Sequence, residues 1–248
     1  MKPVPAWLRR LSDCTADLLF PPACTGCGER LEPFTRDRAF LCPFCRAAFA
    51  ASGQACRLQY PVGADGANES VHVSLCLYDP KTPDGVPQRV IYRIKHNRDR
   101  RVFDGLGRAL AAGIRRRLDE SGIRTDCVIC AYPPRKAATA RREGVDQARE
   151  LARSTAKHLG VPCVPLFVRA RRSGTAQKQL SAADRQTQAA SAYRLNDRQS
   201  GKAAGKCVIL VDDVCTTGAT LDALTVLARG AGAADVIRAC VGRTASRS

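Results

Sequence analysis

Two adjacent carboxylates and a threonine-rich loop lie together near the C-terminus. An unbroken apolar run, Cys207 to Val211, precedes Asp212 and Asp213, and Thr216-Thr217-Gly218-Ala219-Thr220 follows. The apolar run predicts a strand that is buried on both faces, as in a parallel sheet with helices on each side. A loop of hydroxyl residues and glycine before a helix presents N–H groups to a phosphate, whereas carboxylates suit sugar hydroxyls or a bridging metal. The stretch therefore predicts a site for a phosphorylated sugar.

Two other interpretations fit this stretch less well. In the first, the acidic residues merely cap the following helix, but an N-cap needs one carboxylate rather than two followed by three threonines. In the second, the stretch is a P-loop, but Cys207 follows Gly205-Lys206 where that motif requires Ser or Thr. Cys215 lies between the acid pair and the loop, and its thiol is a candidate nucleophile.

Four cysteines near the N-terminus have the spacing of metal ligands. Cys24 and Cys27 form one CxxC pair, and Cys42 and Cys45 form a second after 14 intervening residues. Two such pairs suit a tetrahedral zinc site in which four thiolates leave no open position, so we predict a structural zinc. The alternative is four unrelated buried thiols.

The composition favours an anionic partner. Among 248 residues there are 40 Lys and Arg against 23 Asp and Glu, which gives a net charge of +17. This excess favours nucleic acid or anionic substrates, although aromatic residues make up only 5% and few bases could stack. We find neither a leader-like apolar segment nor an apolar run of about 18 residues, so we expect a cytoplasmic protein without membrane insertion and with reduced thiols.

The periodicity of the chain predicts an α/β fold. Besides the strand at 206–211, we expect main-sheet strands at 126–132, 161–168 and 235–241, an outlying strand at 71–78 and a short strand at 193–195. Helices are expected at 86–97, 101–118 and 143–159, and after Thr220, where Leu221, Leu224 and Leu227 have helical spacing. Residues 169–190 are polar, basic and nearly free of large apolar side chains, which predicts a lid or binding loop.

The two basic helices are a candidate nucleic-acid surface. Between Arg89 and Arg117 there are many bases and only two acids, Asp99 and Asp104. Charge runs are usually solvated helical faces, but this density also fits an anion-binding face. We expect sequence-independent binding of single-stranded DNA, with charge supplied by Arg98, Arg100, Arg101 and Arg115 to Arg117.

The stretch around the acid pair resembles the PRPP-binding motif of type I phosphoribosyltransferases, which have a Rossmann-like parallel sheet with helices on both faces. The resemblance implies that Asp212 and Asp213 hold the ribose hydroxyls and that Thr216 to Thr220 wrap the 5′-phosphate. It also implies Mg²⁺ with PRPP, a mobile loop at 169–190, and stabilisation of the leaving pyrophosphate by Arg135 and Lys136. Cys215 then fills a position at which the motif tolerates many residues.

The order of the segments resembles the ComF (competence protein F) family of bacteria over nearly the whole chain. The matches are the paired CxxC, the RVIYRIKHN, PPRK and QKQLSAADR segments, and VDDVCTTGAT, whereas Arg142 to Gln147 departs from the family pattern. The resemblance implies a zinc-ribbon domain (1–60), a linker with an edge strand (61–85) and a phosphoribosyltransferase domain (86–248).

The same resemblance implies a role in natural transformation, with incoming single-stranded DNA and competence-machinery proteins as partners. The alternative is an active Mg²⁺-dependent phosphoribosyltransferase, or an amidophosphoribosyltransferase-like enzyme, in nucleotide salvage.

Overall fold

The computed structural model describes residues 21–32, 40–59, 73–82, 84–96, 99–135, 145–170 and 191–244. Its α-helices are α2 (Pro43–Gln59), α3 (Val86–His96), α4 (Arg100–Glu120), α6 (Gln147–Leu159) and α8 (Ala219–Gly230). Its strands are β1 (Val73–Leu77), β2 (Val128–Ala131), β3 (Phe167–Arg169), β4 (Tyr193–Leu195), β5 (Cys207–Cys215) and β6 (Asp235–Arg243). Short 3₁₀ turns, η1 (Thr125–Cys127) and η2 (Ser200–Lys202), precede β2 and β5.

Four parallel strands form the main sheet in the order β1-β6-β5-β2. The expectation that residues 161–168 form a strand of this sheet was wrong. Only 167–169 are extended, as β3, and they pair antiparallel with β4 in a separate two-stranded sheet. Pro162 and Pro165 lack amide hydrogens, so the preceding segment makes only an isolated bridge from Cys163 to Cys130 of β2. The strand predicted at 71–78 is β1, the edge strand of the main sheet.

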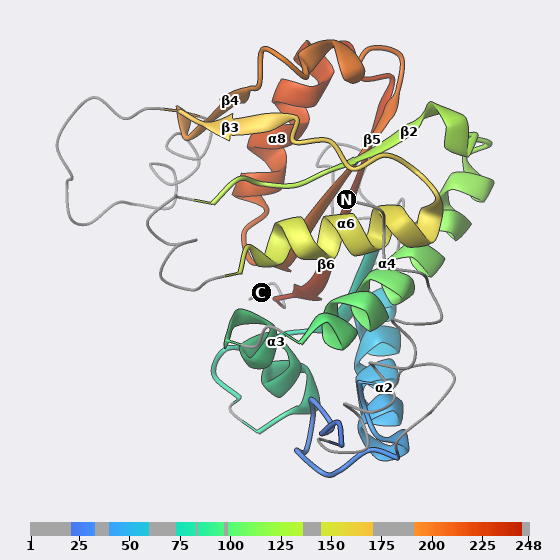
Figure 1. Ribbon diagram of the computed structural model, residues 1–248, viewed down its shortest axis with the longest axis vertical. Coiled ribbons are helices and arrows are strands. Elements are labelled where there is room, and N and C mark those ends of the chain that lie inside the picture. Colours follow the sequence, from blue (N-terminus) through green and yellow to red (C-terminus); the bar gives the residue numbers. More distant parts are fainter. Residues whose placement is uncertain are drawn as a thin grey trace, which may run out of the picture.

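Helices cover both faces of the sheet, as predicted (Figure 1). Alternate residues of β5 point to opposite faces: Ile209 and Val211 pack in the cluster that also contains α4 and α6, and Val208 and Leu210 pack against α8. All four side chains are fully buried, which explains why the strand reads as a continuous apolar run rather than an alternating one.

The strand β5 is longer than its apolar run predicted. It continues through the acid pair to Cys215, because β6 pairs with it over its whole length, whereas β2 pairs only with Cys207 to Leu210. The acid pair therefore lies on a strand segment that has a neighbour on one side only. The other side of this segment faces the ends of β2 and β3.

The second CxxC pair starts helix α2. Cys42 immediately precedes the helix and Pro43 is its first residue, a position where a missing amide hydrogen costs nothing. Cys24, Cys42 and Cys45 are buried in the same apolar cluster as α3 and α4. Within the described ranges, no helix combines the length and apolar character needed to cross a membrane.

Candidate functional site

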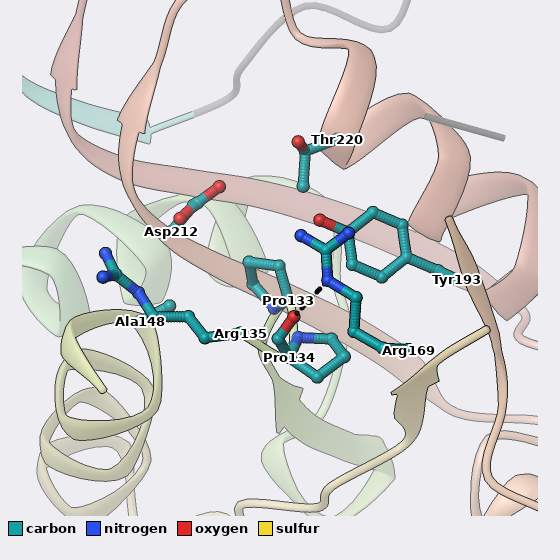
Figure 2. A pocket seen from close by; sticks show the side chains of 8 residues that line it. All are labelled: Pro133, Pro134, Arg135, Ala148, Arg169, Tyr193, Asp212 and Thr220. Atoms are coloured by element: carbon teal, nitrogen blue, oxygen red, sulfur yellow. Dashed lines mark hydrogen bonds between the residues drawn. The ribbon is translucent and has the colours of Figure 1, made fainter. Parts of the chain in front are cut away.

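A pocket of about 350 Å³ opens at the carboxyl ends of β2 and β5. The chain leaves β2 towards Cys163, on the outer side of that strand, and leaves β5 towards β6 on the opposite side. Neighbouring strands whose connections diverge in this way leave a crevice between their ends, where open α/β sheets bind ligands. The residues that line the pocket come from the ends of these strands, from α6, from α8 and from the β3–β4 pair: Pro133, Pro134, Arg135, Ala148, Arg169, Tyr193, Asp212 and Thr220 (Figure 2).

The two carboxylates of the acid pair have different surroundings. Asp212 lines the pocket, whereas Asp213 is buried and its Oδ2 accepts a hydrogen bond from Arg135 Nη2 at 3.3 Å. Their Oδ1 atoms accept from backbone amides of β5 itself, those of Asp213 and Val214, each at 2.8 Å. These contacts differ from those of a helix cap, because the acceptors take amides of the strand and not of α8.

The surroundings of Asp212 disfavour the charged form of its carboxyl group. Burial raises its pKa well above the usual range, and the neighbouring charge of Asp213 adds to the effect, whereas Arg135 opposes it. Arg135 also forms an ion pair with Asp213, at 3.3 Å. A cation or a hydrogen-bond donor brought by a ligand would therefore stabilise the charged form of Asp212.

The threonine-rich loop joins β5 to α8 at the edge of the pocket. Gly218 precedes the helix with φ of +80°, which favours glycine, and Thr217 Oγ1 accepts a hydrogen bond from the amide of Ala219 at 3.4 Å. Thr216 and Thr217 are exposed, Ala219 follows the glycine, and Thr220 lines the pocket. The N-terminus of a twelve-residue helix thus faces the same cavity as Asp212.

Two residues of this pocket were not singled out from the sequence: Arg169 was predicted only as one of the bases of the 169–190 loop, and Tyr193 only as part of a short strand. Arg169 and Tyr193 are directly opposite each other in the antiparallel β3–β4 pair. In the sequence, the only feature that connects them is that they lie on either side of the polar 171–190 segment. The pairing of β3 with β4 brings them together. That segment and Lys136 lie outside the described residues.

An ion pair between a buried arginine and a partly exposed aspartate holds α8 against β6. The side chain of Arg238 is 6% exposed, and its Nη1 lies 2.6 Å from Asp222 Oδ1 in the first turn of α8. Its Nε donates to Thr225 Oγ1 at 3.0 Å, and this hydroxyl in turn donates to Leu221 O at 2.8 Å. The network fixes the helix whose N-terminus lies at the pocket.

The four predicted metal ligands come together. The Sγ atoms of Cys24, Cys27, Cys42 and Cys45 all lie within 4.8 Å of one another, and those of Cys27 and Cys42 are 3.8 Å apart. A tetrahedral zinc site with bonds of about 2.3 Å requires sulfur–sulfur separations of about 3.8 Å, so the cluster has the dimensions of a zinc site.

Backbone amides prepare this cluster for a cation. Cys24 Sγ accepts from the amides of Gly26 at 3.3 Å and Cys42 at 3.2 Å. Burial alone would raise the pKa of the Cys24 thiol, but these hydrogen bonds outweigh burial and lower it to about 6. In contrast, burial raises the pKa of Cys215 to about 11, which leaves a protonated thiol at neutral pH and argues against a nucleophile.

The sequence from 145 to 247 matches the family described as the phosphoribosyl transferase domain. These residues form a phosphoribosyltransferase domain. The match covers α6, both strands of the β3–β4 pair, the acid pair, the threonine-rich loop and β6, and it begins after Arg135. Together with the parallel sheet and its two helical layers, it gives the chain an α/β phosphoribosyltransferase-like fold with an N-terminal four-cysteine cluster.

Several solved structures resemble the phosphoribosyltransferase domain at low identity. An allosteric regulatory enzyme of purine biosynthesis is 20% identical over 70% of this chain and 31% of its own, with a TM-score of 0.38. Glutamine PRPP amidotransferase from B. subtilis, complexed with ADP and GMP, is 21% identical over 70% of this chain and 32% of its own, with a TM-score of 0.36. PRPP synthetase from Mycobacterium smegmatis is 20% identical over 55% of this chain and 33% of its own, with a TM-score of 0.34. The chain thus spans about a third of their lengths. A comparison with curated proteins gives no match.

Replacing Asp212 with Asn is expected to stabilise the ligand-free protein, and more so at high pH. The pKa of Asp212 is raised in the folded protein, so the unfolded chain loses this proton first and folding stability falls as pH rises above about 4. Asn keeps an oxygen acceptor for the Asp213 amide and does not titrate. Thermal melts should show a larger advantage of Asp212→Asn at pH 8 than at pH 5. An equal difference at both pH values would contradict this origin.

Proposed function

We propose that this protein binds PRPP in the pocket at the ends of β2 and β5. The observation that carries the proposal is the pairing, in one cavity, of a carboxylate that makes no ion pair with the described residues, Asp212, with the N-terminus of α8, from which Thr220 lines the cavity. The carboxylate suits the ribose hydroxyls, and the helix N-terminus with its hydroxyls suits the 5′-phosphate. Arg135 and Arg169 add positive charge for a diphosphate.

The same arrangement of residues also supports a second proposal, that the protein transfers the phosphoribosyl group of PRPP to an acceptor. Breaking the bond between the anomeric carbon and pyrophosphate develops negative charge on the leaving group, which Arg135 and Lys136 would stabilise, and positive charge on the ribose, which Asp212 would stabilise. Mg²⁺ would bind through Asp212 and oxygens of PRPP, because hard cations prefer oxygen ligands, and when bound it neutralises the diphosphate. The acceptor attacks from the opposite side of the ribose. Release of pyrophosphate on addition of candidate bases tests for turnover.

Mg²⁺·PRPP is expected to raise the melting temperature of the wild-type protein. A ligand at 100 times its Kd stabilises the folded state by about 2.7 kcal/mol, which corresponds to about 5–10 °C for a chain of this size. Replacing Asp212 and Asp213 together with Asn should reduce the shift to below about 1 °C, because neutral amides replace the charged acceptors of the ribose hydroxyls and of Mg²⁺. Differential scanning fluorimetry measures both.

A matched control replaces Asp126 and Asp197 with Asn, two exposed acids away from the pocket. This variant should keep the full shift. A shift that survives in the Asp212/Asp213 double variant would mean that PRPP binds elsewhere, and no shift in the wild type would refute PRPP binding.

We further propose that the protein binds single-stranded nucleic acid, as the ComF resemblance implies, in a cleft between α4 and α6. This cleft of about 610 Å³ is lined by Arg100, Arg101, Arg153 and Lys157, with Asp104 and Glu150 as its acidic members. The two helices pack side by side (Figure 1). The sequence indicated the two basic helices between Arg89 and Arg117, which are α3 and α4, whereas the contributions of α6 come from a helix about 50 residues after α4.

Single-stranded DNA binding is expected to weaken when Arg100 and Arg153 are replaced with Glu. Each lost phosphate contact should make the slope of log affinity against log salt less negative by about 0.7, so the double variant should differ by about 1.4. Fluorescence anisotropy with a labelled oligonucleotide measures this.

Replacing Arg194 and Arg229 with Glu, outside the cleft, makes the same change in net charge and is the control. Equal loss in both double variants would indicate that only net charge matters. Loss of DNA binding with PRPP binding intact would favour a DNA-handling role, as in natural transformation with competence-machinery proteins. Turnover of PRPP without DNA binding would favour nucleotide salvage.

A further inference from the structure

Arg169 is held in a defined position at the pocket by three elements. Its guanidinium carbon lies 4.8 Å from the centroid of the Tyr193 ring, across the β3–β4 pair. Its Nε donates to the carbonyl oxygen of Pro134 at 3.2 Å, in the turn that follows β2. A guanidinium that is stacked on one face and anchored through Nε has its terminal Nη groups left to contact a ligand.

The two guanidiniums of the pocket differ in how their charge is compensated. Arg135 pairs with Asp213, and this charge is shared before any ligand binds. Among the described residues, no carboxylate lies within ion-pair distance of Arg169, whose contacts are an aromatic ring and a neutral carbonyl. Arg169 therefore supplies positive charge that has no described protein counter-ion.

The direction of the side chains places this charge at the centre of the pocket. Figure 2 shows the Arg169 guanidinium and the Tyr193 hydroxyl pointing towards the space between Asp212 and Thr220. Tyr193 is 9% exposed, so its ring is fixed by packing and offers a rigid platform. A planar guanidinium on such a platform suits bidentate contact with phosphoryl oxygens.

We propose that Arg169 is the residue by which this pocket recognises a phosphoryl group, and that Tyr193 is the residue that positions it. The proposal rests on the proposed PRPP site and deepens it, because it makes ligand choice depend on a strand pair outside the main sheet. The phosphoryl group is either the 5′-phosphate, since Thr220 lies beside Arg169 in the pocket, or the pyrophosphate, since the Pro134–Arg135 turn also does. Both groups offer the same phosphoryl oxygens to a guanidinium, so binding of ribose 5-phosphate and of pyrophosphate must be measured separately to distinguish them.

The test measures the affinities of PRPP, ribose 5-phosphate and pyrophosphate by isothermal titration calorimetry. Arg169→Gln should weaken PRPP binding at least tenfold, and should weaken binding of at least one of the two fragments to a similar extent. The affected fragment identifies the phosphoryl group. Arg169→Lys should recover only part of the affinity, because an ammonium group cannot reproduce the planar contact.

Variants of Tyr193 separate positioning from folding. Tyr193→Phe keeps the ring under the guanidinium and should stay within about threefold of the wild type. Tyr193→Leu removes the platform and should weaken the same fragment that Arg169→Gln affects, with little change for the other. A uniform loss for both fragments in Tyr193→Leu would indicate general disruption and would overturn the positioning role. Arg116→Gln, on the exposed surface of α4, is the matched control.

The outcomes distinguish this inference from the proposed function. PRPP binding that is unchanged in Arg169→Gln, or lost equally in Arg116→Gln, would overturn the role of Arg169 and leave the PRPP site standing. A wild-type protein that binds pyrophosphate or ribose 5-phosphate through Arg169, but not PRPP, would refute the proposed function and keep the phosphoryl site. A wild-type protein that binds none of the three ligands would overturn both.

Discussion

Replacing Cys42 with Ser is expected to remove the metal and unfold the region around α2 and α3. Structural zinc contributes roughly 10–16 kcal/mol of apparent binding free energy in peptides, which matches or exceeds the whole stability of an ordinary domain. The cluster is also part of the main core: a Cβ on Gly26 would lie 2.6 Å from Cys45 Sγ and 3.3 Å from Val86 of α3. Cys42 itself is 7% exposed. Loss of the metal should therefore loosen α3 as well as the cysteine loops.

Metal analysis and circular dichroism measure this effect. The wild-type protein should contain about one zinc per chain, and the Cys42→Ser variant should contain almost none and lose helical signal on mild heating. Cys127→Ser is the matched control, because Cys127 is an exposed cysteine outside the cluster and should change neither quantity. A Cys42→Ser protein with full zinc content and an unchanged melting temperature would show that the four thiols are not its ligands.

Replacing Arg238 with Met is expected to cost about 1.5–3 kcal/mol of the free energy of unfolding. The side chain of Asp222 is 33% exposed, so water solvates part of the charge that loses its partner, but Asp222 and the buried Thr225 hydroxyl both lose their contact with β6. Asp222 lies in the first turn of α8, close to the proposed phosphate site, so its uncompensated charge should also weaken anion binding there.

Urea denaturation at neutral pH measures the stability term. The double variant Arg238→Met with Asp222→Leu should recover much of the loss, because no carboxylate is left without its partner. Arg229→Met, an exposed position at the other end of α8, should stay within about 0.5 kcal/mol of the wild type. A loss below about 1 kcal/mol in Arg238→Met would mean that the pair does not hold the helix to the sheet.

The sequence by itself determined the local parts of this molecule. The strand, acid pair and threonine-rich loop between Cys207 and Thr220 lie within 14 consecutive residues, so their order specifies a strand–loop–helix unit whatever surrounds it. The four cysteines are similar, because two CxxC turns at that spacing have few ways to present thiolates other than to one another. The helices α3 and α4 followed from their apolar periodicity.

Only the tertiary structure decided which strands are neighbours and which side chains share a cavity. The place of β1 beside β6 depends on pairing between segments more than 150 residues apart, and no local pattern encodes such a pairing. The same holds for Arg169 and Arg238, whose partners come from other elements. Asp212 and Asp213 have different environments because adjacent residues on a strand point in opposite directions: Asp212 lines the pocket, whereas Asp213 is buried and pairs with Arg135. Their individual roles thus depend on the burial and the neighbouring charges that the assembled sheet provides. The identities of two adjacent residues do not encode these surroundings.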